Sequence, residues 1–182
     1  MSAEGTTGGE FAVVDGAAPD KNWQRLWFSL HSRAWSTLAI VPTDMGTDVT
    51  HIAEKLAAVG QHYGAGPIDL LDAVGAEFAD TQALVDSINE TRARGRLVLV
   101  ACDPLHQNPP TIPIVRSTSG VLLVVRLGES RLASARKVVE IVGRDRMLGA
   151  ITLGESSSGS SVVGDRRKRE RRGFVDFFRS FR

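Results

Sequence analysis

The chain has 182 residues, of which 42% are hydrophobic and 24% are charged, and its formal net charge is +1. This composition suffices for one soluble domain of about 150 residues with tails. A single cysteine excludes an internal disulfide framework and is typical of a reducing compartment. No uninterrupted apolar run reaches the roughly 18 residues that a membrane-spanning helix needs.

Residues 1–18 are rich in Gly, Ala and Thr and have little periodicity, which predicts a disordered leader. They contain no basic stretch followed by an apolar run, so we expect no signal peptide. The predicted location is cytoplasmic. A peripheral position at the inner face of the cell membrane is an option that depends on the C-terminal segment.

The next segment has apolar residues at helical spacing, namely Trp23, Leu26, Trp27 and Leu30. This stripe predicts a helix that packs on the folded domain. The alternative is a self-association surface formed by Trp23, Arg25, Leu26 and Trp27, because two of the three tryptophans lie there. A homo-oligomer is therefore one option for this chain.

Residues 36–57 predict a strand over 37–41, a loop over 42–49 and a helix that begins near Thr50. Such a unit places backbone N–H groups and a helix N-terminus where a nucleotide phosphate would bind. The phosphate-binding loop (P-loop) signature ends in Gly-Lys-Ser/Thr. Aligned through Gly46 and Thr50, this chain has Asp48, Val49 and Thr50 at those positions. Valine thus replaces the phosphate-binding lysine, and a carboxylate stands where the backbone should approach an anion.

Further strands are predicted over 68–73, 96–102, 120–126 and 147–153, with helices between most of them. Asp80 is the predicted N-cap of one helix, which ends at Gly95. The loop 103–113 contains four prolines and is predicted to be rigid rather than helical. The helix after 120–126 places one set of apolar residues on a single face: Leu132, Ala135, Val139 and Val142. Strands that alternate with helices over 19–153 predict an α/β fold, a three-layer doubly wound sheet with about five mainly parallel strands.

Ligand sites in such folds lie at the carboxyl ends of the strands. Those ends carry residues 42–49, Asp72, residues 102–104 and residues 126–130. Cys102, Asp103 and His106 are candidate metal ligands by residue type, but one cysteine with one histidine four residues later is a weak signal. We favour a strand end and a surface loop there and predict no metal site.

Several segments resemble the cytoplasmic domain of bacterial tyrosine autokinases, which serve capsule and exopolysaccharide export and belong to the wider ParA/MinD-like P-loop group. GTDVTHIAEKLA (46–57) is similar to that family's GEGKSTVAANLA, and DLLDAV (69–74) is similar to its LLIDAD. VACDPL (100–105) together with 119–153 resembles the strand that carries the Mg²⁺-associated Asp and the segment that closes the domain. NWQRLWFSL (22–30) stands where the family has an oligomerisation helix. The resemblance implies a P-loop-NTPase-like fold with strand order 2-3-1-4-5, strand 1 in the centre, and polysaccharide export as the process.

The chain departs from this family at the residues that catalysis needs. Val74 replaces the second Asp of the second motif, the acidic position of the third motif falls on Cys102 or Asp103, and the helix pattern Glu-x-x-Arg-x-x-Arg is reduced to Arg25. The degenerate nucleotide site implied by the alignment consists of Gly46, Thr47, Asp48, Val49, Thr50, Asp72 and Asp103. Without the lysine and with an added carboxylate, phosphoryl transfer loses its charge stabilisation. We therefore predict a pseudokinase or pseudo-ATPase with no catalytic residue and no bound cofactor.

The C-terminal segment 165–182, which follows a predicted Gly/Ser linker at 154–164, is strongly basic. It holds eight Lys/Arg and three Asp/Glu, so the rest of the chain has a net charge of −4. A cationic block comprises Arg166, Arg167, Lys168, Arg169, Arg171 and Arg172. Apolar residues follow at helical spacing: Phe174, Val175, Phe177, Phe178 and Phe181. The segment is predicted to be a basic amphipathic helix.

Such a tail favours a protein partner or an anionic membrane surface, with docking on its own domain as the alternative. The sequence thus predicts a non-catalytic scaffold or regulator that its tail recruits. One alternative is a residual ParA/MinD-like nucleotide-binding switch that uses Thr50, Asp72 and Asp103. Another is nucleic-acid binding through the arginines, which is disfavoured because no recognition motif is found and the rest of the chain is acidic.

Overall fold

A computed structural model describes residues 20–154. The predicted leader (1–18), all of the predicted linker except Gly154, and the predicted basic helix (165–182) lie outside the described residues. The described elements, in chain order, are α1 (Lys21–His31), β1 (Thr37–Pro42), α2 (Val49–His62), β2 (Ile68–Ala73), α3 (Phe78–Ala93), β3 (Leu97–Cys102), α4 (Thr111–Ser117), β4 (Gly120–Arg126), α5 (Leu132–Val142), the 3₁₀ turn η1 (Arg144–Arg146) and β5 (Met147–Leu153).

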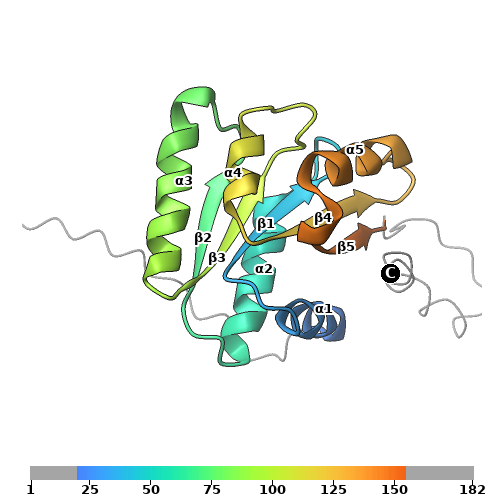
Figure 1. Cartoon of the computed structure of the whole chain (residues 1–182). Coiled ribbons are helices and arrows are strands. Elements are labelled where there is room, and N and C mark those ends of the chain that lie inside the picture. Colours follow the sequence, from blue (N-terminus) through green and yellow to red (C-terminus); the bar gives the residue numbers. More distant parts are fainter. Residues whose placement is uncertain (1–19, 155–182) are drawn as a thin grey trace, which may run out of the picture.

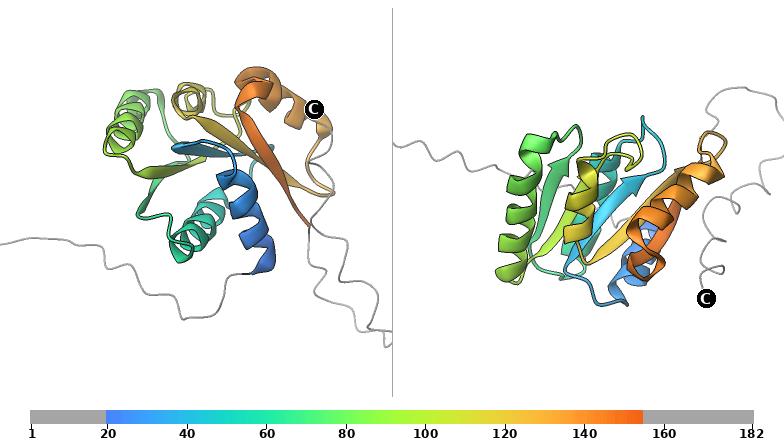
Figure 2. Two further views of the ribbon diagram at one scale, coloured as in Figure 1. Left: turned by 60° about the horizontal axis from the view of Figure 1, so that its bottom comes forward. Right: turned by 45° about the horizontal axis from the view of Figure 1, so that its top comes forward.

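The five strands form one sheet in the order β2-β3-β1-β4-β5, and every neighbouring pair is parallel. The predicted order and the central position of the first strand are therefore confirmed. β1 is buried along its whole length, because it pairs with β3 on one side and β4 on the other. Helices α3, α4 and α5 cover one face of the sheet, and α1 and α2 cover the other (Figures 1 and 2).

The alternation of side chains along β1 divides the core into two layers. Leu38 and Ile40 belong to the cluster beneath α1 and α2, whereas Ala39 and Val41 belong to the cluster beneath α3, α4 and α5. Successive residues of a strand point to opposite faces, so a continuous apolar run fills both layers. This pattern explains why β1, β3 and β4 are apolar apart from residues at their ends, such as Thr37 and Arg126.

The structure differs from the sequence prediction at two helices. The N-cap of α3 is Glu77, and Asp80 lies three residues further on, where its carboxylate accepts a hydrogen bond from the Glu77 N–H at 3.1 Å. Residues 111–117 form the helix α4 although part of this segment was predicted to be non-helical. Pro113 is compatible with α4 because it lies in the first turn, where a missing N–H breaks no intrahelical hydrogen bond.

The folded domain is electrically balanced. Residues 20–154 contain 14 Lys/Arg and 14 Asp/Glu, so the acidic charge outside the tail comes from residues 1–19 and Glu155. The acidic character inferred for the rest of the chain therefore does not extend to the folded domain. Among residues 20–154, no helix is long and apolar enough to cross a membrane.

Candidate functional site at the carboxyl edge of the sheet

The first turn of α2 lies where a P-loop would hold phosphate. Asp48 is the N-cap of this helix, and its Oδ1 accepts a hydrogen bond from the backbone N–H of His51 at 2.9 Å. Aspartate is among the best N-cap residues because it satisfies a helix N–H that has no intrahelical partner. The chain's own carboxylate therefore occupies the helix N-terminus, where an external anion would otherwise bind.

Val49, at the lysine position, begins α2 and is 3% exposed. It belongs to the core cluster beneath α1 and α2. Thr50 follows it in the first helical turn and is half-buried. A side chain packed in the core in place of lysine supplies no charge to the loop.

A hollow of about 330 Å³ opens beside this helix start, at the carboxyl ends of β1 and β3. Five of the seven residues predicted for the nucleotide site line it: Gly46, Thr47, Asp48, Val49 and Asp103. Asp44, Val74 and Cys102 also line it, and none of its lining residues is basic. The hollow is thus bordered by three aspartates, a polarity opposite to that of a phosphate site.

The other two predicted residues lie apart from this hollow. Asp72, at the end of β2, lines a neighbouring hollow of about 460 Å³ together with Val74 and Asp80. Its Oδ1 accepts a hydrogen bond from the Val74 N–H at 2.9 Å. Thr50 lines neither hollow. The structure therefore brings together the loop and Asp103 but not the whole predicted set.

Asp103 is 6% exposed and joins two loops. Its Oδ2 accepts hydrogen bonds from the Gly75 N–H at 2.7 Å and from the Asn108 amide at 2.8 Å. The same amide nitrogen donates to the carbonyl of Ala76 at 3.1 Å. A buried carboxylate with two donors is stabilised by charge-assisted hydrogen bonds. Asp103 thus fixes the β2–α3 loop to the proline-rich loop.

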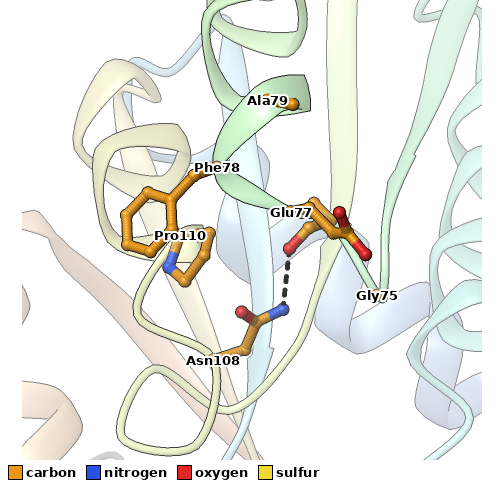
Figure 3. Close-up of a pocket in the computed structure, with 7 residues that line it drawn as sticks. Gly75, Glu77, Phe78, Ala79, Asn108 and Pro110 are labelled. Atoms are coloured by element: carbon orange, nitrogen blue, oxygen red, sulfur yellow. Dashed lines mark hydrogen bonds between the residues drawn. The ribbon is translucent and has the colours of Figure 1, made fainter.

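Asn108, which the sequence analysis did not single out, also borders a third hollow of about 430 Å³. Figure 3 shows Phe78 beside Pro110 on one side of this hollow and the Asn108 amide directed at the β2–α3 loop. Phe78 is 76% exposed. A lone asparagine in a loop has no periodic signal, so only the structure identifies its role.

Cys102 ends β3 and is completely buried. Burial raises the pKa of its thiol, and the nearby Asp103 and Asp72 carboxylates raise the pKa further. Its Sγ donates to the carbonyl of Val100 at 3.7 Å. The thiol therefore stays protonated and is a poor nucleophile and a poor metal ligand. Within residues 20–154, no group of three or more His, Cys, Asp or Glu side chains is placed to hold a metal ion.

Side chains after β4 hold the β1–α2 loop in place, and the sequence analysis did not foresee this network. It consists of a Thr43–Ser130 hydroxyl pair at 2.5 Å, a Ser134 hydroxyl that donates to Asp44 Oδ1 at 3.0 Å, and an Arg126 Nη2 that donates to the carbonyl of Met45 at 3.1 Å. Partial burial raises the pKa of Asp44, but the nearby hydroxyl groups of Ser134, Ser130 and Thr43 outweigh it and hold this pKa below 3.8. The two loops therefore form one hydrogen-bonded unit.

Arg126 contacts the P-loop-like turn but leaves no free charge there. Its Nη2 lies 2.5 Å from a carboxylate oxygen of Glu129. Gly46 has φ +82°, and a Cβ at this position would lie 3.5 Å from Arg126 Nη2. Glycine is required at this position because other residues rarely adopt a positive φ.

The helix predicted to offer a self-association surface is α1. Leu26 and Trp27 are buried in the core of the same chain, Trp23 is half-buried, and Arg25 is exposed. Trp27 stacks on His31, with ring centroids 5.2 Å apart. Leu26 and Trp27 thus pack inside one chain, and self-association through the rest of α1 stays a prediction.

Comparison with known proteins shows a likeness in fold. No family model and no curated protein matches the sequence. Among solved structures, the chain is similar to the chimerical protein CapA2B2, with a TM-score of 0.60 and 12% identity over 72% of this chain and 82% of that one. It is also similar to the kinase domain of the Escherichia coli tyrosine kinase ETK (TM-score 0.56, 14% identity, 71% and 72% covered) and to the BceF tyrosine kinase domain (TM-score 0.58, 13% identity, 72% and 74% covered).

Proposed function

We propose that this protein is a non-catalytic scaffold or regulator, related to the polysaccharide-export tyrosine kinases, that its basic C-terminal segment recruits to a membrane or a partner assembly. The fold shared with tyrosine kinase domains supports the relationship. The observation that carries the non-catalytic part is the Asp48 cap on α2, because this carboxylate occupies the helix N-terminus.

Electrostatics argue against a bound triphosphate. Asp44, Asp48 and Asp103 border the hollow and no lining residue is basic, so a phosphate would meet like charges without a compensating cation. Val49 adds no hydrogen-bond donor in place of the lysine. The missing charge-assisted contact alone removes about 1.5–3 kcal/mol of binding free energy.

Calorimetry with MgATP tests the non-catalytic part. The wild-type protein is expected to give no saturable heat at millimolar MgATP. Asp48→Ser is a matched control, because serine caps a helix as well as aspartate but carries no charge. Asp48→Gly with Val49→Lys restores the motif and reports whether these two residues alone block the site, provided that its melting curve stays cooperative. A wild-type dissociation constant in the low micromolar range would refute the proposal and favour the nucleotide-switch alternative.

Deletion of residues 165–182 tests the recruitment part. The deletion should leave the melting temperature unchanged and abolish pelleting with vesicles that contain phosphatidylserine. Phe177→Ala with Phe178→Ala should have nearly the same effect, because apolar insertion and basic attraction act together. If the intact protein does not pellet with the vesicles while its tail binds a specific protein, recruitment is to a protein partner. Salt-sensitive DNA binding through the arginines would instead favour the nucleic-acid alternative.

A further inference from the structure

The β4–α5 corner of the domain exposes large apolar side chains. Leu127 and Leu132 are 53% and 61% exposed, and Met45 in the adjoining loop is 55% exposed. The spacing of α5 puts Leu132 on one face with Ala135, Val139 and Val142, but the buried residues of α5 are Val138 and Val142. Exposed apolar side chains that lie together on a surface mark an interaction site more often than single ones do.

Hydrogen bonds hold the backbone that carries these three side chains in position. The network between the β1–α2 loop and the start of α5 joins the backbone of Met45 to Arg126, the neighbour of Leu127. It also joins Asp44, next to Met45, to Ser134 in the first turn of α5. The backbone that carries the apolar side chains is therefore held in place. Little backbone conformational entropy is lost when these side chains are buried.

Exposed cations lie at the start of α5 and along it, on one side of this corner. Arg131, Arg136 and Lys137 are exposed, and none of them makes an ion pair within residues 20–154. The charge of Arg126 is balanced by Glu129. Projecting apolar side chains flanked by free cations match an anionic lipid surface, in which apolar groups enter the acyl boundary and cations meet the headgroups.

The chain also leaves the folded domain at this corner. The Leu127 N–H donates to the carbonyl of Leu153 at 2.7 Å, one residue before the described chain ends. The basic segment 165–182 follows after ten further residues, which span at most about 35 Å when extended. A membrane that binds residues 165–182 can therefore also contact the β4–α5 corner.

We propose that Met45, Leu127 and Leu132, flanked by Arg131, Arg136 and Lys137, form a second membrane contact that docks the folded domain on an anionic bilayer. The hollow beside Met45 carries three aspartates, which an anionic bilayer repels, so the apolar side chains and the three cations must outweigh this repulsion. This inference adds a contact within the folded domain and rests on the membrane form of the proposed function, because three side chains alone bind weakly.

The first experiment places an environment-sensitive fluorophore at the corner of the full-length protein. Leu132→Cys provides the labelling site, and the native Cys102 stays unlabelled because it is buried and protonated. Phe28→Cys is the matched control. Phe28 is 53% exposed and packs on Tyr63 just after α2 ends, at the opposite edge of the sheet, with ring centroids 4.8 Å apart. The label at 132, and not that at 28, should shift to the blue with phosphatidylserine-containing vesicles and stay unchanged with phosphatidylcholine alone.

The second experiment removes the apolar contact. Leu127→Gln with Leu132→Gln should weaken vesicle binding of the full chain by about tenfold, whereas Phe28→Gln should leave it unchanged. Both side chains are exposed, so the melting temperature should not change. If the protein pellets with vesicles but the label at 132 and the double variant show no effect, the corner contact is refuted and the tail contact stands. If the full chain does not bind vesicles, or if the label responds only to an added protein, the membrane contact is refuted as well.

Discussion

Asp103 gives the sharpest test of whether this edge of the sheet is structural or ligand-binding. Its carboxylate is 6% exposed and accepts two hydrogen bonds through one oxygen, from Gly75 and from Asn108. Asp103→Asn keeps an acceptor of the same shape but removes the charge. A hydrogen bond to a charged group contributes about 1 kcal/mol more than a neutral one, so the two bonds together should cost about 2 kcal/mol. Asp103→Ala removes both bonds and should cost about 4 kcal/mol.

Urea unfolding monitored by tryptophan fluorescence measures these losses. A double-mutant cycle with Asn108→Ala isolates the contact between the two side chains and should give a coupling free energy of about 1.5 kcal/mol. The slope of the unfolding free energy against urea should not change, because the surface exposed on unfolding is the same. A free energy of unfolding that rises in Asp103→Asn would refute the structural role. Such a rise would mean that the Asp103 carboxylate destabilises the folded state, as expected for a group that is retained to bind a ligand.

Two further predictions concern packing and pH. Gly60→Ala should lower the free energy of unfolding by about 1–3 kcal/mol, because a Cβ would lie 2.5 Å from atoms of both Trp27 and Ile68; a neutral effect in chemical unfolding would contradict the packing of α1 on α2. Ser134→Ala removes a donor that lowers the pKa of Asp44, so near neutral pH it should destabilise the protein by about 1 kcal/mol. A carboxylate with a lowered pKa stabilises the fold fully above its ordinary value of 3.8 and loses that contribution as the pH falls through the lower folded value. The gap between wild type and Ser134→Ala in urea midpoint should therefore close below pH 3.8, and a gap that stays constant would rule out this origin.

The sheet could be predicted from the sequence because its signals are local and periodic. Runs such as Leu97–Cys102 are apolar on both faces, and the family resemblance supplied the strand order. The four prolines of 103–113 disfavour a helix, but only Pro113 lies in α4, and a proline in the first turn removes no hydrogen bond. Spacing places Leu132, Ala135, Val139 and Val142 on one face of α5, but the residues of α5 that are buried are Val138 and Val142, because Leu132 begins the helix, where a residue need not face the sheet.

The candidate site was only partly predictable for a physical reason. The loop residues 46–50 are contiguous, so one motif comparison identified them together. The bonds that Asp44, Arg126 and Asn108 make join loops far apart in the chain, and single polar residues in loops carry no periodic signal. The meaning of Asp48 also required coordinates, because only the 2.9 Å bond to His51 shows that its carboxylate serves as a helix cap.

That cap changes how the stability of the domain depends on its surroundings. A protein that binds a free anion at a helix N-terminus is stabilised in proportion to the logarithm of the anion concentration, so its folded population follows the cell's nucleotide supply. Here the anion is covalently attached three residues from the N–H that it satisfies, and its effective concentration is fixed by the chain. A free phosphate must displace the Asp48 carboxylate, whose effective concentration at the helix N-terminus does not change. On the proposed function, the helix α2 therefore keeps the same stability whether nucleotides are abundant or scarce.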